Sequence, residues 1–161
     1  MKTTVITLLS VIAVAVAARA ESTVTLTGVH NCCKSCTTGI SKAVTSVDGA
    51  TCTADKGTVT ITAKSETDAR KAVAALLDAG YFGEGAKAGT ASAAKAKSVT
   101  VAGVHLCCGK CVDAFNKAAT EAGATKTDAV KGAKSVIVDG DLSPKELLAA
   151  LNKGGFNGKV K

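Results

Sequence analysis

Two short segments hold nearly all the residues of this chain that could do chemistry. The segment GVHNCCKSC runs from Gly28 to Cys36, and the segment GVHLCCGKC runs from Gly103 to Cys111, 75 residues further on. Together they contain six of the seven cysteines and both histidines. Thiolates and imidazoles packed into one turn are the donors that soft or borderline metal ions prefer. Both segments therefore predict binding of Cu(I), Zn(II) or Hg(II).

Each cysteine segment lies between a predicted strand and a predicted helix. Polar and apolar residues alternate over 23–27 and over 98–102, which is typical of a half-buried strand. After each segment, apolar residues recur at three- and four-residue spacing and predict helices over 33–46 and 108–122. The first cysteine of each Cys-x-x-Cys pair thus falls at a helix N-terminus, where unpaired N–H groups and the helix dipole favour a thiolate.

A hairpin, a second helix and a short final strand follow in both halves of the chain. The second helices begin at Ser65 and Ser143, each of which has an acidic residue three positions later, as in a capping box. The order in each half is therefore βαββαβ. Such a unit folds as a four-stranded antiparallel sheet with both helices on one face. The predicted fold class is α+β, with two ferredoxin-like sandwiches.

The chain begins with features of a secretory signal peptide. A basic Lys2 precedes an apolar run over 5–17, and Ala18-Arg19-Ala20 has the pattern of a cleavage site. The apolar run is shorter than the about 20 residues needed to cross a bilayer, so cleavage after Ala20 should leave no membrane span. We expect a periplasmic or secreted protein. The remaining 18 basic and 13 acidic residues come with almost no aromatic side chains, which argues against nucleic acid as a partner.

The repeat divides the rest of the chain into two units. After the signal peptide, 1–20, the first metal-binding unit covers 21–85 and the second covers 98–161. The linker between them, 86–97, is rich in Ala and Lys and has no large apolar residue. We expect two units that fold independently, share few interface residues and each hold a metal site of their own.

A βαββαβ unit with Cys-x-x-Cys at the junction of its first strand and first helix resembles the heavy-metal-associated domain family. That family includes copper metallochaperones and periplasmic mercury-binding proteins, and the resemblance covers both halves of this chain. It implies metal ligation by two cysteine pairs, Cys33 with Cys36 and Cys108 with Cys111. It also implies that the partner, apart from the metal ion, is a membrane metal transporter or another metal-binding protein.

Other residues both match and depart from the family pattern. Gly80-Tyr81 and Gly155-Phe156 are similar to the family's glycine-aromatic pair, whose aromatic ring lies beside the metal loop. In the loop itself the family usually has Gly-Met-x-Cys-x-x-Cys, whereas this chain has valine in place of methionine and two additional residues. One histidine and one further cysteine are also added in each copy.

The added donors can be interpreted in two ways. His30, His105, Cys32 and Cys107 either complete a site of three or four donors, which would suit tetrahedral Zn(II), or they cap and pack the loop. Cys32 and Cys107 could also form disulfides in an oxidising compartment. Cys52 is the seventh cysteine, and we expect it to face solvent because Lys126 occupies the matching place in the second half.

The favoured function is a metallochaperone or metal scavenger without enzymatic activity. A thiol-disulfide oxidoreductase is the alternative, because Cys-x-x-Cys at a helix N-terminus is also a redox arrangement. Thioredoxin-like folds place a cis-proline beside the active disulfide, but the chain's one proline, Pro144, is accounted for as the first residue of a helix. A structural module held by disulfides ranks third, since three cysteines in a loop leave one unpaired.

Overall fold

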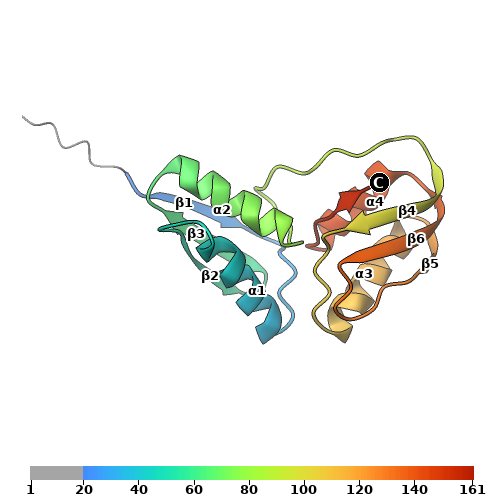
Figure 1. The fold of residues 1–161 in the computed structure, drawn as a ribbon, viewed down its shortest axis with the longest axis horizontal. Coiled ribbons are helices and arrows are strands. Elements are labelled where there is room, and N and C mark those ends of the chain that lie inside the picture. The colour runs from blue at the N-terminus through green and yellow to red at the C-terminus, as the bar shows by residue number, and fades with distance from the viewer. Residues whose placement is uncertain (1–19) are drawn as a thin grey trace, which may run out of the picture.

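A computed structural model describes residues 20–161 of the chain as two αβ halves that lie side by side (Figure 1). The predicted signal peptide lies outside the described residues except for Ala20. Within 20–161, no helix is long and apolar enough to cross a membrane. The two antiparallel sheets and four helices confirm the predicted α+β class.

The first half has three strands and two helices. In chain order these are β1 (Ser22–Leu26), α1 (Lys34–Thr45), β2 (Thr51–Asp55), β3 (Thr58–Ala63) and α2 (Glu66–Asp78). The sheet order is β1-β3-β2. The predicted fourth strand is reduced to an isolated bridge between Thr27 and Glu84, so the expectation of four strands is wrong for this half. Gly83 and Gly85 flank Glu84, and glycine disfavours a regular strand.

The second half has the complete predicted order. It contains β4 (Ala96–Ala102), α3 (Gly109–Glu121), β5 (Ala124–Thr127), β6 (Ser135–Leu142), α4 (Pro144–Lys153) and β7 (Lys159–Val160). The strands pair in the order β5-β6-β4-β7, as an antiparallel sheet. β5 ends at Thr127, and just beyond it the Asp128 carboxylate accepts a hydrogen bond from the backbone N–H of Ile137, at 2.6 Å.

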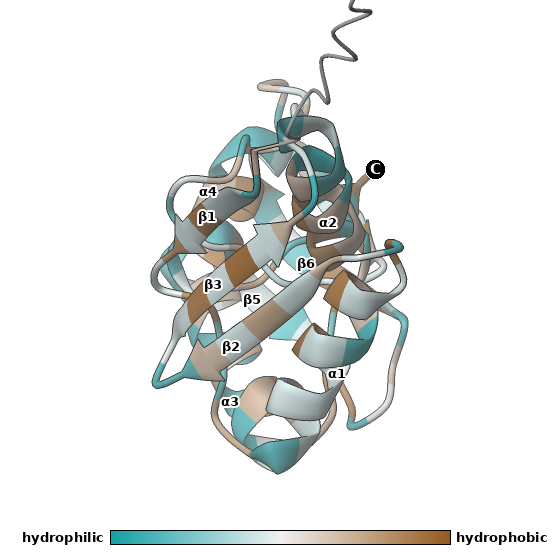
Figure 2. Cartoon of the chain, turned by 90° about the vertical axis from the view of Figure 1, so that its left-hand side faces the viewer, coloured by the Kyte–Doolittle hydropathy of each residue, from teal (hydrophilic) through white to brown (hydrophobic). Residues whose placement is uncertain are grey.

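Apolar side chains from both halves form one continuous core. Along β1, β2 and β3 apolar and polar residues alternate, which can be followed in Figure 2 as brown and pale bands. Ile40 of α1 and Ile61 of β3 are fully buried in the first half, as are Phe115 of α3 and Leu147 of α4 in the second. Tyr81 belongs to the same cluster and lies where the halves meet.

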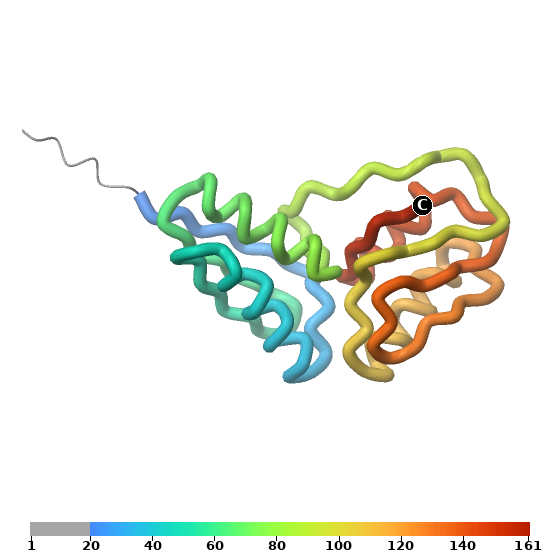
Figure 3. Tube along the Cα trace, in the orientation of Figure 1, coloured from blue at the N-terminus to red at the C-terminus, as the bar shows by residue number. Residues whose placement is uncertain are grey.

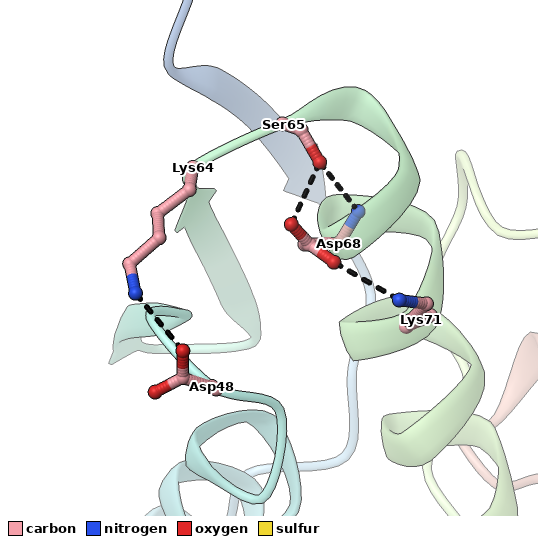
Figure 4. Close-up of polar contacts among 5 residues, drawn as sticks. All are labelled: Asp48, Lys64, Ser65, Asp68 and Lys71. Atoms are coloured by element: carbon pink, nitrogen blue, oxygen red, sulfur yellow. Dashed lines mark hydrogen bonds and ion pairs between the residues drawn. The ribbon is translucent and has the colours of Figure 1, made fainter. Parts of the chain in front are cut away.

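Local hydrogen bonds set the start of α2, which ends beside the cysteine loops. The Ser65 hydroxyl accepts from the backbone N–H of Asp68, at 3.2 Å, and donates to its carboxylate, at 2.7 Å (Figure 4). Lys71 pairs with Asp68 at 3.1 Å, and Lys64 reaches Asp48 at 2.9 Å. The predicted cap at Ser65 is confirmed, as is the one at Ser143, whose hydroxyl accepts from the N–H of Glu146.

The predicted linker runs along the second half. Residues 86–95 form an irregular segment over it (Figure 1), and the carbonyl of Ser92 accepts from the N–H of Lys145, at 2.9 Å. β4 begins at Ala96, so this strand takes in the last two residues of the predicted linker.

The halves share an interface, so the expectation of few contacts between them is wrong. The N–H of Phe82 donates to the carbonyl of Gly155 at 3.0 Å, and the N–H of Asn157 donates to the carbonyl of Gly80 at 2.9 Å. Tyr81 and Phe156 form a bridge between these bonds. The contacts are nearly symmetric: the glycine-aromatic pair of each half lies against the cysteine loop of the other half.

Candidate metal centre

The two cysteine loops lie next to each other. In Figure 3 the segments that follow β1 (blue) and β4 (yellow) run side by side between the two halves. Each begins at a glycine in the left-handed region, Gly28 with φ of 71° and Gly103 with φ of 79°. Val29 and Val104, at 3% and 1% exposure, anchor the loops in the core.

All six loop cysteines converge on one cluster of free thiols. Within the loops, Sγ–Sγ distances are 3.7 Å for Cys33–Cys36 and for Cys32–Cys36, and 3.6 Å for the two matching pairs of the second loop, Cys108–Cys111 and Cys107–Cys111. Contacts between the loops are equally short, 3.5 Å for Cys36–Cys107 and 3.6 Å for Cys32–Cys108. The structure thus brings the predicted cysteines together as one group instead of the two separate sites we expected.

The thiols of the cluster differ in acidity. The backbone N–H of Cys36 stabilises the Cys33 thiolate and lowers the pKa of Cys33 to about 6. In the same way the N–H of Cys111 lowers the pKa of Cys108. Burial raises the pKa values of Cys32, Cys107 and Cys111. Cys33 and Cys108 are therefore the first to ionise, while Cys32, Cys107 and Cys111 retain their protons until a cation compensates the charge.

Both histidines lie within reach of the cluster. The donor atoms of His105, Cys36, Cys107 and Cys111 all lie within 4.8 Å of one another, and those of His30, Cys32 and Cys111 do the same. Burial lowers the pKa of His30 and brings that of His105 to about 4. Both imidazoles are therefore neutral at pH 7 and can offer a lone pair to a metal.

The ring nitrogens of the two histidines have different surroundings. His30 stacks on Phe156 with ring centroids 4.4 Å apart, and its buried Nε2 has no hydrogen-bond partner among the described residues. The Tyr81 hydroxyl lies 3.2 Å from the carbonyl oxygen of Cys36 and 2.8 Å from Nε2 of His105. The hydroxyl has one proton for these two partners, so the tautomer of His105 decides whether Tyr81 donates to Nε2 or accepts from Nε2–H.

Sequence reasoning missed the exchange of aromatic residues between the halves. The resemblance implied an aromatic ring beside the metal loop, and Tyr81 and Phe156 do lie beside the loops, but each contacts the histidine of the other half: Phe156 stacks on His30, and the Tyr81 ring lies tilted against His105 with centroids 4.3 Å apart. Cys52 lies outside the cluster. It is half-buried and faces the core, because it pairs with the fully buried Ile61 and directly opposed residues share a face of the sheet. The expectation that Cys52 faces solvent is wrong.

Fold and site together define an α+β protein with a centre of six thiols and two imidazoles. A search of solved structures matches the chain to the N-terminal soluble domains of Bacillus subtilis CopA, at 18% identity and a TM-score of 0.33, over 89% of this chain and 95% of that chain. No family model and no curated protein matches the chain.

Proposed function

We propose that this protein binds a soft metal ion, with Cu(I) as the preferred ion, and carries or sequesters it without catalysing a reaction. The observation that carries the proposal is the convergence of six free thiols, with Sγ–Sγ contacts of 3.5 to 3.9 Å across two loops. Packing so many thiols together has a cost once they ionise, because like charges repel at short range. A bound cation offsets that cost, because its positive charge attracts the thiolates that would otherwise repel one another and several of them can bind it together.

The chemistry of the donors supports Cu(I) over harder ions. The groups of described residues whose atoms lie close enough to share an ion contain only cysteine and histidine. Sulfur and imidazole donors select soft and borderline ions, and Mg(II) or Ca(II) would require carboxylate or carbonyl oxygens. Zn(II) and Hg(II) are the competing cargoes. Zn(II) would use three thiols and one imidazole, the set formed by Cys36, Cys107, Cys111 and His105.

The proposal also covers location and partner. The signal-peptide pattern of residues 1–20 supports a periplasmic or secreted protein. Free thiols in an oxidising compartment are open to disulfide formation, and bound Cu(I) would protect them. Delivery would proceed by exchange of thiolate ligands with a membrane metal transporter or another metal-binding protein. Cys33 and Cys108, whose pKa values are lowered, are the thiols placed to begin that exchange.

A thiol-disulfide oxidoreductase remains the second candidate because of one observation. Cys33 has a pKa of about 6, and its sulfur lies 3.7 Å from that of Cys36. In a redox cycle the Cys33 thiolate would attack a substrate disulfide, and Cys36 would then displace the mixed disulfide. The substrate would leave as two thiols, and Cys33–Cys36 would remain as a disulfide.

Metal retention and reductase activity separate the two functions. The fully reduced chain, prepared without oxygen, should keep Cu(I) in the presence of excess bathocuproine disulfonate, measured by mass spectrometry of the eluted protein. Replacing Cys33, Cys36, Cys108 and Cys111 by serine should abolish retention, and the control Cys52→Ser should have no effect, because Cys52 lies outside the cluster. Reduction of insulin disulfides without retention of Cu(I), Zn(II) or Hg(II) would instead establish the oxidoreductase.

A further inference from the structure

We propose that the two loops form one polynuclear Cu(I)-thiolate centre that takes up about four Cu(I) ions per chain, instead of one ion in each loop. This inference rests on the proposed function and adds the stoichiometry and the cooperativity of loading.

The contacts among the six sulfurs are ten of the twelve edges of an octahedron, and the two edges without a contact join the adjacent cysteines Cys32–Cys33 and Cys107–Cys108. Ten Sγ–Sγ pairs lie between 3.5 and 3.9 Å apart. The pattern is the same when the two loops are exchanged, so that Cys32 corresponds to Cys107, Cys33 to Cys108 and Cys36 to Cys111. In this octahedral arrangement three pairs of sulfurs occupy opposite corners and do not touch: Cys33 and Cys111, Cys36 and Cys108, and Cys32 and Cys107.

These spacings suit an ion held by three sulfurs. With metal–sulfur bonds of about 2.3 Å, a linear ion separates its two sulfurs by about 4.6 Å, a trigonal ion by about 4.0 Å and a tetrahedral ion by about 3.8 Å. The contacts of 3.5 to 3.9 Å exclude the linear dithiolate arrangement at Cys33–Cys36 without movement. Among the ten contacts the sulfurs close triangles, and no four of the described thiols all touch one another. Sulfur alone therefore provides trigonal sites and no tetrahedral one.

The closed triangles all draw on both loops. They are Cys36 with Cys107 and Cys111, Cys32 with Cys36 and Cys111, Cys32 with Cys108 and Cys111, and Cys33 with Cys36 and Cys107. An ion bound to any of these triangles must bridge the two halves of the chain. The first ion therefore holds the loops together and prepares the sites for the next ions, so loading is cooperative.

The number of ions follows from sharing of the sulfurs. In an octahedron, four trigonal ions on alternate faces give every sulfur two bonds, so about four ions satisfy all six thiolates. In either set of alternate faces two are closed triangles here, and each of the other two lacks only the contact between the adjacent cysteines of one loop. Six thiols that bind four Cu(I) ions release six protons, and the resulting centre has a charge of −2. Two ions would leave a charge of −4 on six ionised thiolates in a half-buried site, a greater electrostatic cost.

Titration of the full reduced chain with Cu(I) tests the inference. Native mass spectrometry should show the apo protein giving way directly to a species with about four Cu(I) ions. Its appearance should coincide with the luminescence of Cu(I)-thiolate clusters, and X-ray absorption should show three sulfur neighbours and Cu–Cu scattering. Cys107→Ser should abolish the cluster species rather than remove a single ion, because it opens triangles that include the sulfurs of the first loop. The matched control is Cys52→Ser.

Three outcomes would overturn the inference. Stepwise binding of two Cu(I) ions without Cu–Cu scattering would establish independent loops while preserving the proposed function. Zn(II) binding lost in His30→Ala/His105→Ala but kept in Cys33→Ser/Cys108→Ser would establish sites of three thiols and one imidazole. Absence of any bound metal would overturn the proposed function as well. The measurements on the unchanged chain decide the matter even where a variant fails to fold.

Discussion

Substitution of Gly80 by alanine should separate the two cysteine loops. Gly80 has φ of 90°, and a Cβ there would lie 2.5 Å from both the carbonyl oxygen of Gly103 and the amide nitrogen of His105. Real Cβ contacts essentially never fall below 3.0 Å, so the second loop would have to recede by at least half an ångström. That loop carries three thiols of the cluster, and its recession would open the contacts between the loops.

Gly132 provides the matched control. Its φ is 84°, close to that of Gly80, and a Cβ there would meet nothing within 4 Å. Both alanine variants incur the left-handed backbone cost of about 1–2 kcal/mol. Gly80→Ala should in addition weaken two hydrogen bonds across the interface, Asn157 to Gly80 at 2.9 Å and Tyr81 to His105 at 2.8 Å. At about 1 kcal/mol each, the extra loss is about 2 kcal/mol, or about thirtyfold in the equilibrium between joined and separated loops.

Two measurements test this effect, one on the stability of the protein and one on the distance between the loops. Urea unfolding should show that both variants lose stability and that Gly80→Ala loses about 2 kcal/mol more. Mild oxidation followed by peptide mass spectrometry should show disulfides between loops, such as Cys32–Cys108, in the original protein and in Gly132→Ala. Their yield should fall at least several-fold in Gly80→Ala. Equal yields in the two variants would refute the reasoning that Gly80 allows the loops to meet.

Three further predictions concern single residues. Iodoacetamide should alkylate Cys33 at a rate that rises as the pH increases through about 6, where its thiol ionises. Cys32, whose pKa is raised by burial, should react only at much higher pH. Peptide mass spectrometry at matched times measures both rates, and equal rates at pH 7 would contradict the assigned order of the two pKa values. Tyr81→Phe removes the hydroxyl that bonds the Cys36 carbonyl and His105, so urea unfolding should show a loss of about 1–3 kcal/mol, and an unchanged midpoint would mean that these bonds contribute nothing. Phe115→Ala should cost about 3–5 kcal/mol because Phe115 is fully buried, whereas the control Phe82→Ala, at a half-buried position, should cost clearly less in the same assay.

Local sequence was sufficient for the order of elements in the second half and for all but the last strand of the first half. The helix starts at Ser65 and Ser143 were predicted from capping residues, and the structure has both. Cys33 and Cys108 were predicted at helix N-termini, and they are the N-cap residues of α1 and α3. These features depend on residues within about one helical turn of each other, so the amino-acid pattern records them directly.

The missing strand and the orientation of Cys52 depended on pairing across the sheet. Glu84 makes only a bridge to Thr27 because the residues around it bond to the other half, through Phe82 and Gly155. Cys52 faces the core through its register with Ile61. A shift of one residue would reverse that orientation, and single-sequence periodicity does not specify the register of a four- or five-residue strand.

The sequence by itself determined which donors this protein has and that each set lies at the start of a helix. It also predicted a soft metal ion as the ligand, because the chemistry of thiols and imidazoles is a property of the residues. Only the tertiary structure decided that the two sets form one centre. The joining contacts are made by backbone groups of Gly80, Gly155 and Asn157 and by the close approach that glycine permits. Backbone groups are common to every residue, so the residue types of the chain do not predict such an interface.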